Sequence, residues 1–154
     1  MAEPPPLDIP SIHASCIAIG ETGVLIRGPS GAGKSWLALS LILDAPRALP
    51  SAELVADDRV LLAVEAGTLV ARPVPLLAGL VEARGLGIRR LASRPRVAVR
   101  LLIDLAADDA ERMPRPELRR ARVQGVELQR LAAKGPEQAR LLLAATLAGG
   151  DYEN

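Results

Sequence analysis

Residues 24–43 read VLIRGPSGAGKSWLALSLIL, and this stretch decides the fold. An apolar run from Val24 leads directly into a glycine-rich segment, and apolar residues then recur at helical spacing as far as Leu43. The segment GPSGAGKS fits G-x-x-x-x-G-K-[ST], the pattern of the phosphate-binding P-loop. A strand, a P-loop and a helix in this order indicate an α/β domain that binds the phosphates of a nucleotide.

The P-loop residues match the chemistry of phosphate binding. Glycines let the backbone N–H groups turn inward, Lys34 supplies an ammonium for the β- and γ-phosphates, and the Ser35 hydroxyl is suited to Mg²⁺. A chance match in a glycine-rich turn is the alternative, but Lys34 is one of two lysines among 19 basic residues. The predicted nucleotide-binding residues are Gly28, Pro29, Ser30, Gly31, Ala32, Gly33, Lys34 and Ser35.

Length and composition indicate one domain in a cytoplasmic protein. The chain has 154 residues, 49% of them apolar and 1% aromatic, so aliphatic side chains must build the core. A net charge of +1 argues against a nucleic-acid binder, and the single Cys16 allows no internal disulfide. The N-terminus lacks the features of a signal peptide, and no apolar run is long enough to span a membrane. We expect a flexible lead-in at 1–10, a P-loop kinase domain at 11–147 and a disordered tail at 148–154.

Working outward from the P-loop, the sequence predicts alternating strands and helices. Residues 76–91 contain three glycines and suggest loop as much as strand. The other predicted elements are strands at 12–19 and 23–28 joined as a hairpin, a helix at 34–45, a strand at 54–56, a hairpin at 59–74, a strand at 97–105, a loop at 108–116, one strand at 122–131 and a helix at 135–148.

Two adjacent carboxylates end the predicted strand at 54–56. P-loop proteins keep an acidic residue beside Mg²⁺ at such a strand end, although an acidic pair also commonly starts a turn. Adjacent side chains on a strand point in different directions. Of Asp57 and Asp58, one can therefore face the metal while the other serves as a base toward the acceptor hydroxyl.

The segments IHASCIAI, GVLIRGPSGAGKS, LVADDRV and VEARGLGIRRL together resemble the catalytic domain of bacterial HPr kinase/phosphorylase, in the short form that lacks the N-terminal domain. The resemblance implies a P-loop kinase fold of the HPr kinase/PEP carboxykinase type, with a mixed central sheet, a P-loop helix and a C-terminal helix. It also implies ATP and Mg²⁺ as cofactors and a hexameric homo-oligomer. The implied activity is phosphorylation of a serine on HPr, a small phosphocarrier of the sugar phosphotransferase system, and its reversal.

The resemblance also implies roles for individual residues. Lys34 belongs to the ATP-binding segment, and Ser35 and Glu82 match the Mg²⁺ ligands of the family. Asp58 matches the residue that acts as base in phosphorylation and as acid in dephosphorylation, and Asp57 then either assists at the metal or orients the phosphate.

Two further catalytic residues come from the resemblance. His13 matches a histidine on the strand before the P-loop hairpin, and Arg112 matches an arginine of a later active-site loop. From the residues alone, His13 is more typical of a structural histidine and Glu82 of a solvated turn. An arginine run from Arg84 to Arg100 is either solvated surface or a phosphate-binding group that begins with Arg84.

The sequence departs from the family in two places. Trp36 stands where the family usually has an acidic residue, which can place an indole at a partner surface. The segment AAKGPE, at 132–137, retains only Lys134 of a segment tied to dephosphorylation, so the kinase reaction is better supported than the reverse reaction. Two other functions stay open: a catalytically silent ATP-sensing module, and a P-loop kinase of a small metabolite. A GTPase is disfavoured because neither lysine lies in an [NT]-K-x-D motif.

Overall fold

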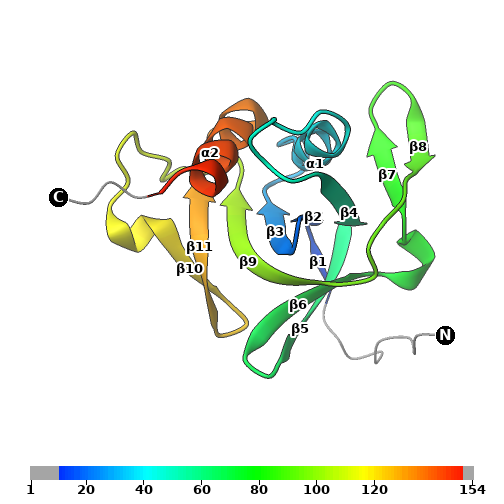
Figure 1. The fold of residues 1–154 in the computed structure, drawn as a ribbon, viewed down its shortest axis with the longest axis horizontal. Coiled ribbons are helices and arrows are strands. Elements are labelled where there is room, and N and C mark those ends of the chain that lie inside the picture. Colours follow the sequence, from blue (N-terminus) through cyan, green and yellow to red (C-terminus); the bar gives the residue numbers. More distant parts are fainter. Residues whose placement is uncertain (1–10, 151–154) are drawn as a thin grey trace.

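The computed structural model describes residues 11–150 (Figure 1). The predicted lead-in and residues 151–154 of the predicted tail lie outside this part. The strands are β1 (Ser11–His13), β2 (Ser15–Ile19), β3 (Thr22–Arg27), β4 (Ala52–Ala56), β5 (Arg59–Glu65), β6 (Thr68–Pro73), β7 (Leu80–Ala83), β8 (Gly87–Arg90), β9 (Val97–Asp104), β10 (Arg120–Val123) and β11 (Val126–Ala132). The helices are α1 (Lys34–Leu43) and α2 (Pro136–Ala148), with 3₁₀ turns η1 (Pro75–Leu77) and η2 (Pro116–Arg119).

One mixed sheet forms the centre of the molecule. The strand order is β1-β5-β6-β9-β3-β2-β4, and β11 also pairs with β9 and carries β10 at its far edge. The P-loop strand β3 runs parallel to β9 and antiparallel to β2, while β9 also runs parallel to β11. The predicted α/β fold with a mixed central sheet and a C-terminal helix is therefore confirmed.

The sheet is buried on both faces, which explains its nearly continuous apolar strands. Side chains alternate between the faces, so Val24 and Ile26 point to one core and Leu25 to the other. The first core is covered by α1 and α2, which lie on the same side of the sheet in Figure 1. The second core is closed by the curled β5–β6 hairpin. Both helices are thereby held at the end of the sheet where β3 and β9 finish.

One predicted strand needs correction, and the segment that the sequence left open between loop and strand is assigned. The single strand predicted at 122–131 is the β10–β11 hairpin, because Gln124 and Gly125 both have positive φ and make a tight turn between the strands. Residues 80–90 form a separate two-stranded sheet, β7–β8, which stands beside α1 in Figure 1. Helix α2 ends at Ala148, as the helix predicted at 135–148 does.

Two expectations from composition concern Cys16 and membrane spans. Cys16 is buried, and burial raises the pKa of its thiol to about 12, so the thiol stays protonated and unreactive. Within residues 11–150, neither helix has the length and apolar character required to cross a membrane.

Candidate active site

The P-loop joins β3 to α1 in the geometry of an anion-binding site. Gly33 is the residue before α1, and its φ of +100° places it in the left-handed region that favours glycine. A Cβ atom on Gly33 would lie 2.7 Å from the Cγ atom of Pro136, the first residue of α2. The loop is thus packed against α2, and the free N–H groups at the start of α1 face the loop interior.

Gly33→Ala is expected to lower the free energy of unfolding by about 3 kcal/mol, because it combines backbone strain with the clash against Pro136. Gly67→Ala is the matched control. Gly67 also has a positive φ, +80°, but a Cβ there meets no atom within 4 Å, so strain alone should cost about 1 kcal/mol. If urea unfolding showed the same loss of unfolding free energy for Gly33→Ala and Gly67→Ala, the close contact between the P-loop and Pro136 of α2 would not matter for stability.

Lys34 is the first residue of α1 and is buried. Its ammonium donates hydrogen bonds to the carbonyl oxygens of Gly28, at 2.7 Å, and Pro29, at 3.1 Å. A buried ammonium must be satisfied in this way, and here the loop itself supplies the acceptors. The positive charge therefore lies inside the loop, where a phosphate would bind.

Asp57, at the end of β4, connects three elements around the loop. This buried carboxylate accepts hydrogen bonds from the hydroxyls of Ser35, at 2.8 Å, and Ser15, at 2.6 Å. The backbone N–H of Glu82 also donates to it, at 3.4 Å. The carboxylate thus faces the P-loop and fixes α1, β2 and β7 relative to one another.

Asp58 points away from the P-loop interior, into the open cavity. Its side chain is 67% exposed, and the Nε2 atom of His13 lies 2.8 Å from its Oδ1 atom. Its φ of +67° is unusual for a residue other than glycine, although aspartate and asparagine tolerate it best. This left-handed conformation turns Asp58 to the side opposite Asp57, so the two adjacent carboxylates face different environments, as the sequence predicts.

The site residues line a cavity of about 370 Å³. Five of the seven predicted catalytic and metal residues meet there, with Arg84 from the turn after β7 and Trp36 and Leu39 from α1. Asp57 does not line the cavity and lies behind Ser35. The lining residues are His13, Ser15, Ser30, Gly31, Gly33, Lys34, Ser35, Trp36, Leu39, Asp58, Glu82, Ala83 and Arg84. The arrangement can bind phosphate at one end and present a carboxylate to a second substrate at the other.

The donor set fits a magnesium ion that is shared with a substrate phosphate. No group of three or more His, Cys, Asp or Glu side chains able to hold a metal occurs within residues 11–150. Mg²⁺, however, is usually bound through one or two carboxylates together with waters and substrate phosphates. The Ser35 hydroxyl, already bonded to Asp57, and the neighbouring Glu82 provide such a partial set.

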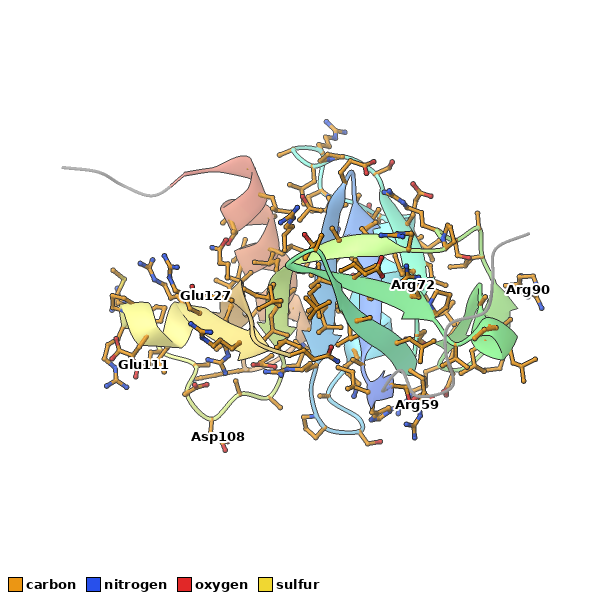
Figure 2. All side chains as sticks on the ribbon, turned by 90° about the horizontal axis from the view of Figure 1, so that it is seen from below. Arg59, Arg72, Arg90, Asp108, Glu111 and Glu127 are labelled. Atoms are coloured by element: carbon orange, nitrogen blue, oxygen red, sulfur yellow. The ribbon has the colours of Figure 1, made fainter. Side chains whose placement is uncertain are left out.

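Arg112 does not line this cavity. It lies on the loop between β9 and η2 and lines a second cavity of about 650 Å³, together with Lys134 and Arg119. Asp108 and Glu111, on the same loop, lie at the opposite end of the molecule from Arg90 of β8 (Figure 2). Within one chain, Arg112 therefore lines a different cavity from the P-loop, and its position does not support the predicted catalytic role.

Ser15 belongs to the site, although no motif predicts it. Its buried hydroxyl makes the shortest hydrogen bond to Asp57. The sequence does carry one indication of this role. Ser15 follows His13 by two residues in an otherwise apolar run, and residues two apart on a predicted strand share a face. Ser15 and Ser35 both donate to the Oδ1 atom of Asp57, so Ser15 helps to hold this carboxylate at the P-loop.

Ser15→Ala is expected to lower the free energy of unfolding by about 2 kcal/mol, because a buried hydrogen bond to a charged carboxylate is lost. Ser51→Ala, at an exposed position, is the control and should change stability by less than about 0.5 kcal/mol. Urea unfolding of both variants measures the difference. If the two substitutions cost the same, the hydroxyl of Ser15 does not hold Asp57 in place.

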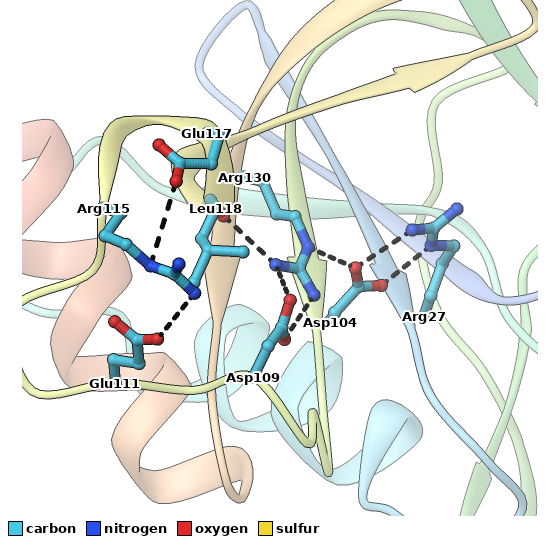
Figure 3. A network of polar contacts seen from close by, with 8 residues as sticks. All are labelled: Arg27, Asp104, Asp109, Glu111, Arg115, Glu117, Leu118 and Arg130. Carbon is cyan, nitrogen blue, oxygen red and sulfur yellow. Dashed lines mark hydrogen bonds and ion pairs between the residues drawn. The ribbon is translucent and has the colours of Figure 1, made fainter.

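A chain of ion pairs supports the base of the P-loop (Figure 3). Asp104, at the end of β9, accepts hydrogen bonds from Arg27, the residue before the loop, and from Arg130 of β11. Arg130 also holds Asp109 through two bonds of 2.9 Å and the carbonyl oxygen of Leu118. Asp104 lies at the end of β9, which runs parallel to β3, but its carboxylate is already bonded to two arginines. Asp57 is the carboxylate that bonds to the P-loop serine, Ser35.

Fold and site together define an α/β protein in which a glycine-rich loop joins β3 to α1 beside the buried Lys34. The family model described as "HPr Serine kinase C-terminal domain" matches residues 8–116, and the chain belongs to this family.

Individual relatives agree with this family. The chain is 38% identical over 109 residues to the HPr kinase/phosphorylase of Neisseria meningitidis serogroup C, covering 66% of this chain and 32% of that protein. It is 46% identical over 79 residues to the HPr kinase/phosphorylase of Streptococcus thermophilus, covering 51% of this chain and 24% of that protein. The chain thus spans about a third or less of these curated relatives.

A solved structure resembles most of the fold. The Hpr(Ser) kinase/phosphatase from Coxiella burnetii has a TM-score of 0.69 and 26% sequence identity, and the match covers 90% of this chain and 93% of that chain. The elements beyond the family-model match, including β11 and α2, therefore fall largely within this similarity.

Proposed function

We propose that this chain is an ATP-dependent protein-serine kinase that phosphorylates an HPr-like phosphocarrier. One observation carries the proposal. The adjacent carboxylates Asp57 and Asp58 diverge, so that one faces the P-loop serine and the other faces open solvent beside His13. A small-molecule kinase would enclose its acceptor, whereas here the carboxylate that faces the acceptor is accessible to a protein surface.

The P-loop residues bind and orient the nucleotide. On nucleotide binding, Lys34 exchanges its hydrogen bonds with the carbonyl groups of Gly28 and Pro29 for bonds to phosphate oxygens. The N–H groups at the start of α1 contribute further donors. Ser35 and Glu82 would hold Mg²⁺, with Asp57 behind Ser35, and the ion would neutralise charge on the β- and γ-phosphates.

Asp58 is the proposed general base. Its carboxylate accepts the proton of the acceptor serine hydroxyl while the serine oxygen forms a bond to the γ-phosphorus. The bond between the γ-phosphorus and the oxygen that bridges to the β-phosphate breaks, and ADP leaves. His13 holds the Asp58 carboxylate through the 2.8 Å contact, and Arg84 carries positive charge at the same cavity.

The reverse reaction uses the same groups. An oxygen of inorganic phosphate forms a bond to the phosphoserine phosphorus while the bond from that phosphorus to the serine oxygen breaks. Protonated Asp58 donates its proton to the serine oxygen, and pyrophosphate leaves. Because Lys134 and Arg112 line the other cavity, they would assist this step only if another copy brought them to the site. The forward reaction is the one that the residues lining the cavity support directly.

The cellular setting follows from the acceptor. A phosphocarrier that exchanges phosphate with ATP works in the cytoplasm, where the buried Cys16 thiol stays reduced. A hexamer stays an expectation from the family resemblance.

The test is phosphoryl transfer from ATP labelled in the γ-phosphate to purified HPr in the presence of Mg²⁺. We expect label on a serine of HPr, in an amount that increases with time and enzyme. Binding of labelled ATP without transfer to HPr would favour an ATP-sensing module. Transfer to a small metabolite but not to HPr would assign the P-loop to another kinase reaction.

A further inference from the structure

Large apolar side chains are exposed beside the opening of the phosphate cavity. Trp36, on the first turn of α1, is 50% exposed, and Leu86 and Ile88 of the β7–β8 hairpin are 69% and 63% exposed. Every residue of β8 is exposed. An exposed tryptophan together with two exposed aliphatic side chains is uncommon on a surface without a partner.

The hairpin places these side chains on the same side as the catalytic cavity. Ile88 is the register partner of Glu82, and residues directly opposite on antiparallel strands share a face of the hairpin. Glu82 lines the cavity together with Trp36 and Arg84. Leu86 lies on the turn that follows Arg84, so the apolar side chains border the opening where Asp58 is accessible.

The same hairpin carries an excess of positive charge, with three arginines and the single carboxylate of Glu82. Arg84, Arg89 and Arg90 form no ion pair within residues 11–150, whereas Arg72, Arg94 and Arg96 each pair with a glutamate there. Figure 2 shows Arg90 at one extremity of the molecule, extending away from the main sheet. Apolar side chains surrounded by unpaired arginines favour a partner surface that is apolar at its centre and acidic at its rim.

We propose that Trp36, Leu86 and Ile88, with Arg84 and Arg90, form the docking surface for the acceptor protein. This surface, termed the indole–hairpin surface, binds an apolar patch next to the acceptor serine and carboxylates around that patch. The inference rests on the proposed kinase function. A second copy of this chain fits less well, because a symmetric contact would bring the arginines of the two hairpins together.

The first test compares two leucine substitutions in the whole chain. Leu86→Gln lies in the indole–hairpin surface, and Leu141→Gln lies on the outer face of α2, where the leucine is also 69% exposed. We expect Leu86→Gln to raise the KM for purified HPr roughly tenfold, a typical loss for a residue at the centre of an interface. The KM for ATP should stay unchanged, and Leu141→Gln should leave both KM values unchanged. Ile88→Gln is a second variant with the same expected effect.

The second test uses Trp36, the only tryptophan of the chain, as a fluorescent probe. Adding purified HPr to the enzyme saturated with a non-hydrolysable ATP analogue should shift the Trp36 emission to shorter wavelength, because the indole becomes buried. The shift should need roughly tenfold more HPr in Leu86→Gln and should weaken with salt. HPr must contain no tryptophan in this experiment, or its tryptophan must be replaced.

The outcomes separate the docking surface from the kinase function. Phosphorylation of HPr with an unchanged KM in both Leu86→Gln and Ile88→Gln would overturn the docking surface alone. A shift of Trp36 emission on raising the concentration of this chain alone, lost in Leu86→Gln, would assign the surface to a second copy. A shift caused by the ATP analogue alone, with no further effect of HPr, would assign Trp36 to the nucleotide base. No phosphorylation by the unmodified chain would instead count against the proposed function.

Discussion

Asp58→Asn is expected to lower kcat for serine phosphorylation by roughly 10³-fold, within the range that general-base catalysis contributes. Asparagine keeps the shape of the side chain and tolerates the φ of +67° at this position, and its amide can still contact His13. It cannot accept the serine proton. ATP affinity should change little, because Lys34 and the P-loop are untouched. Steady-state phosphorylation of HPr and direct binding of labelled ATP measure the two effects.

Asp108→Asn is the control for this experiment. Asp108 is also exposed, but it lies on the loop after β9, does not line the phosphate cavity, and should change neither kcat nor the affinity for ATP (Figure 2). If Asp58→Asn kept more than about a tenth of the wild-type kcat, the proton would have to be accepted elsewhere. In that event the general-base assignment of Asp58 would be wrong, whereas the P-loop assignment would stand.

Asp104→Ala is expected to lower the free energy of unfolding by about 3 kcal/mol, because it leaves two guanidinium groups without their shared carboxylate. Arg27 and Arg130 both bond to Asp104, and the Arg130 side chain is only 12% exposed (Figure 3). The substitution also frees the strand end that leads into the P-loop. Urea unfolding at neutral pH measures the loss.

Asp109→Ala removes only the outer end of the same ion-pair chain. Asp109 is more exposed than Asp104, so its loss should lower the free energy of unfolding much less than the loss of Asp104. Arg130 keeps its bond to Asp104 in this variant. If Asp104→Ala and Asp109→Ala lowered the free energy of unfolding equally, the ion pair between Arg27 and Asp104 would contribute nothing beyond the outer ion pair.

The stabilisation by Asp104 should depend on pH. Burial by itself raises the pKa of this carboxyl, but hydrogen bonds from Arg27 and Arg130 and their positive charges hold the pKa below its ordinary value. A carboxyl with a lowered pKa stabilises the folded state above the pKa of the unfolded chain, about 3.9. This contribution is lost as the pH falls through the lower pKa of the folded state. The stability difference between wild type and Asp104→Ala should therefore shrink in strong acid, and a constant difference would contradict the ion-pair explanation.

The parts of the fold that can be predicted from the sequence depend on local patterns. The P-loop motif fixes β3 and α1 because the glycine spacing, the apolar strand and the helical period all lie within twenty residues or so. Pro136 similarly marks the start of α2. The β10–β11 hairpin was not predicted, because its turn depends on Gln124 adopting a positive φ, which no residue pattern specified.

The candidate site is predictable only in part, for a similar reason. Asp57, Asp58 and Lys34 belong to recognisable segments, and the two carboxylates diverge as their adjacency on a strand end predicts. The contact between Ser15 and Asp57 spans 42 residues, and the contact between Arg27 and Asp104 spans 77. Such pairs depend on strand order, which local spacing does not encode. The position of Arg112 away from the cavity also follows from the tertiary arrangement of the loop after β9.

The most direct test of the central claim is the identity of the phosphorylated residue. Purified HPr is incubated with ATP, Mg²⁺ and either the unmodified chain or Asp58→Asn, and the acid-stable phosphate on HPr is then mapped by mass spectrometry. The proposed mechanism predicts one phosphoserine with the unmodified chain and almost none with Asp58→Asn. HPr that stays unmodified while the chain binds ATP, or equal phosphorylation by both proteins, would contradict it.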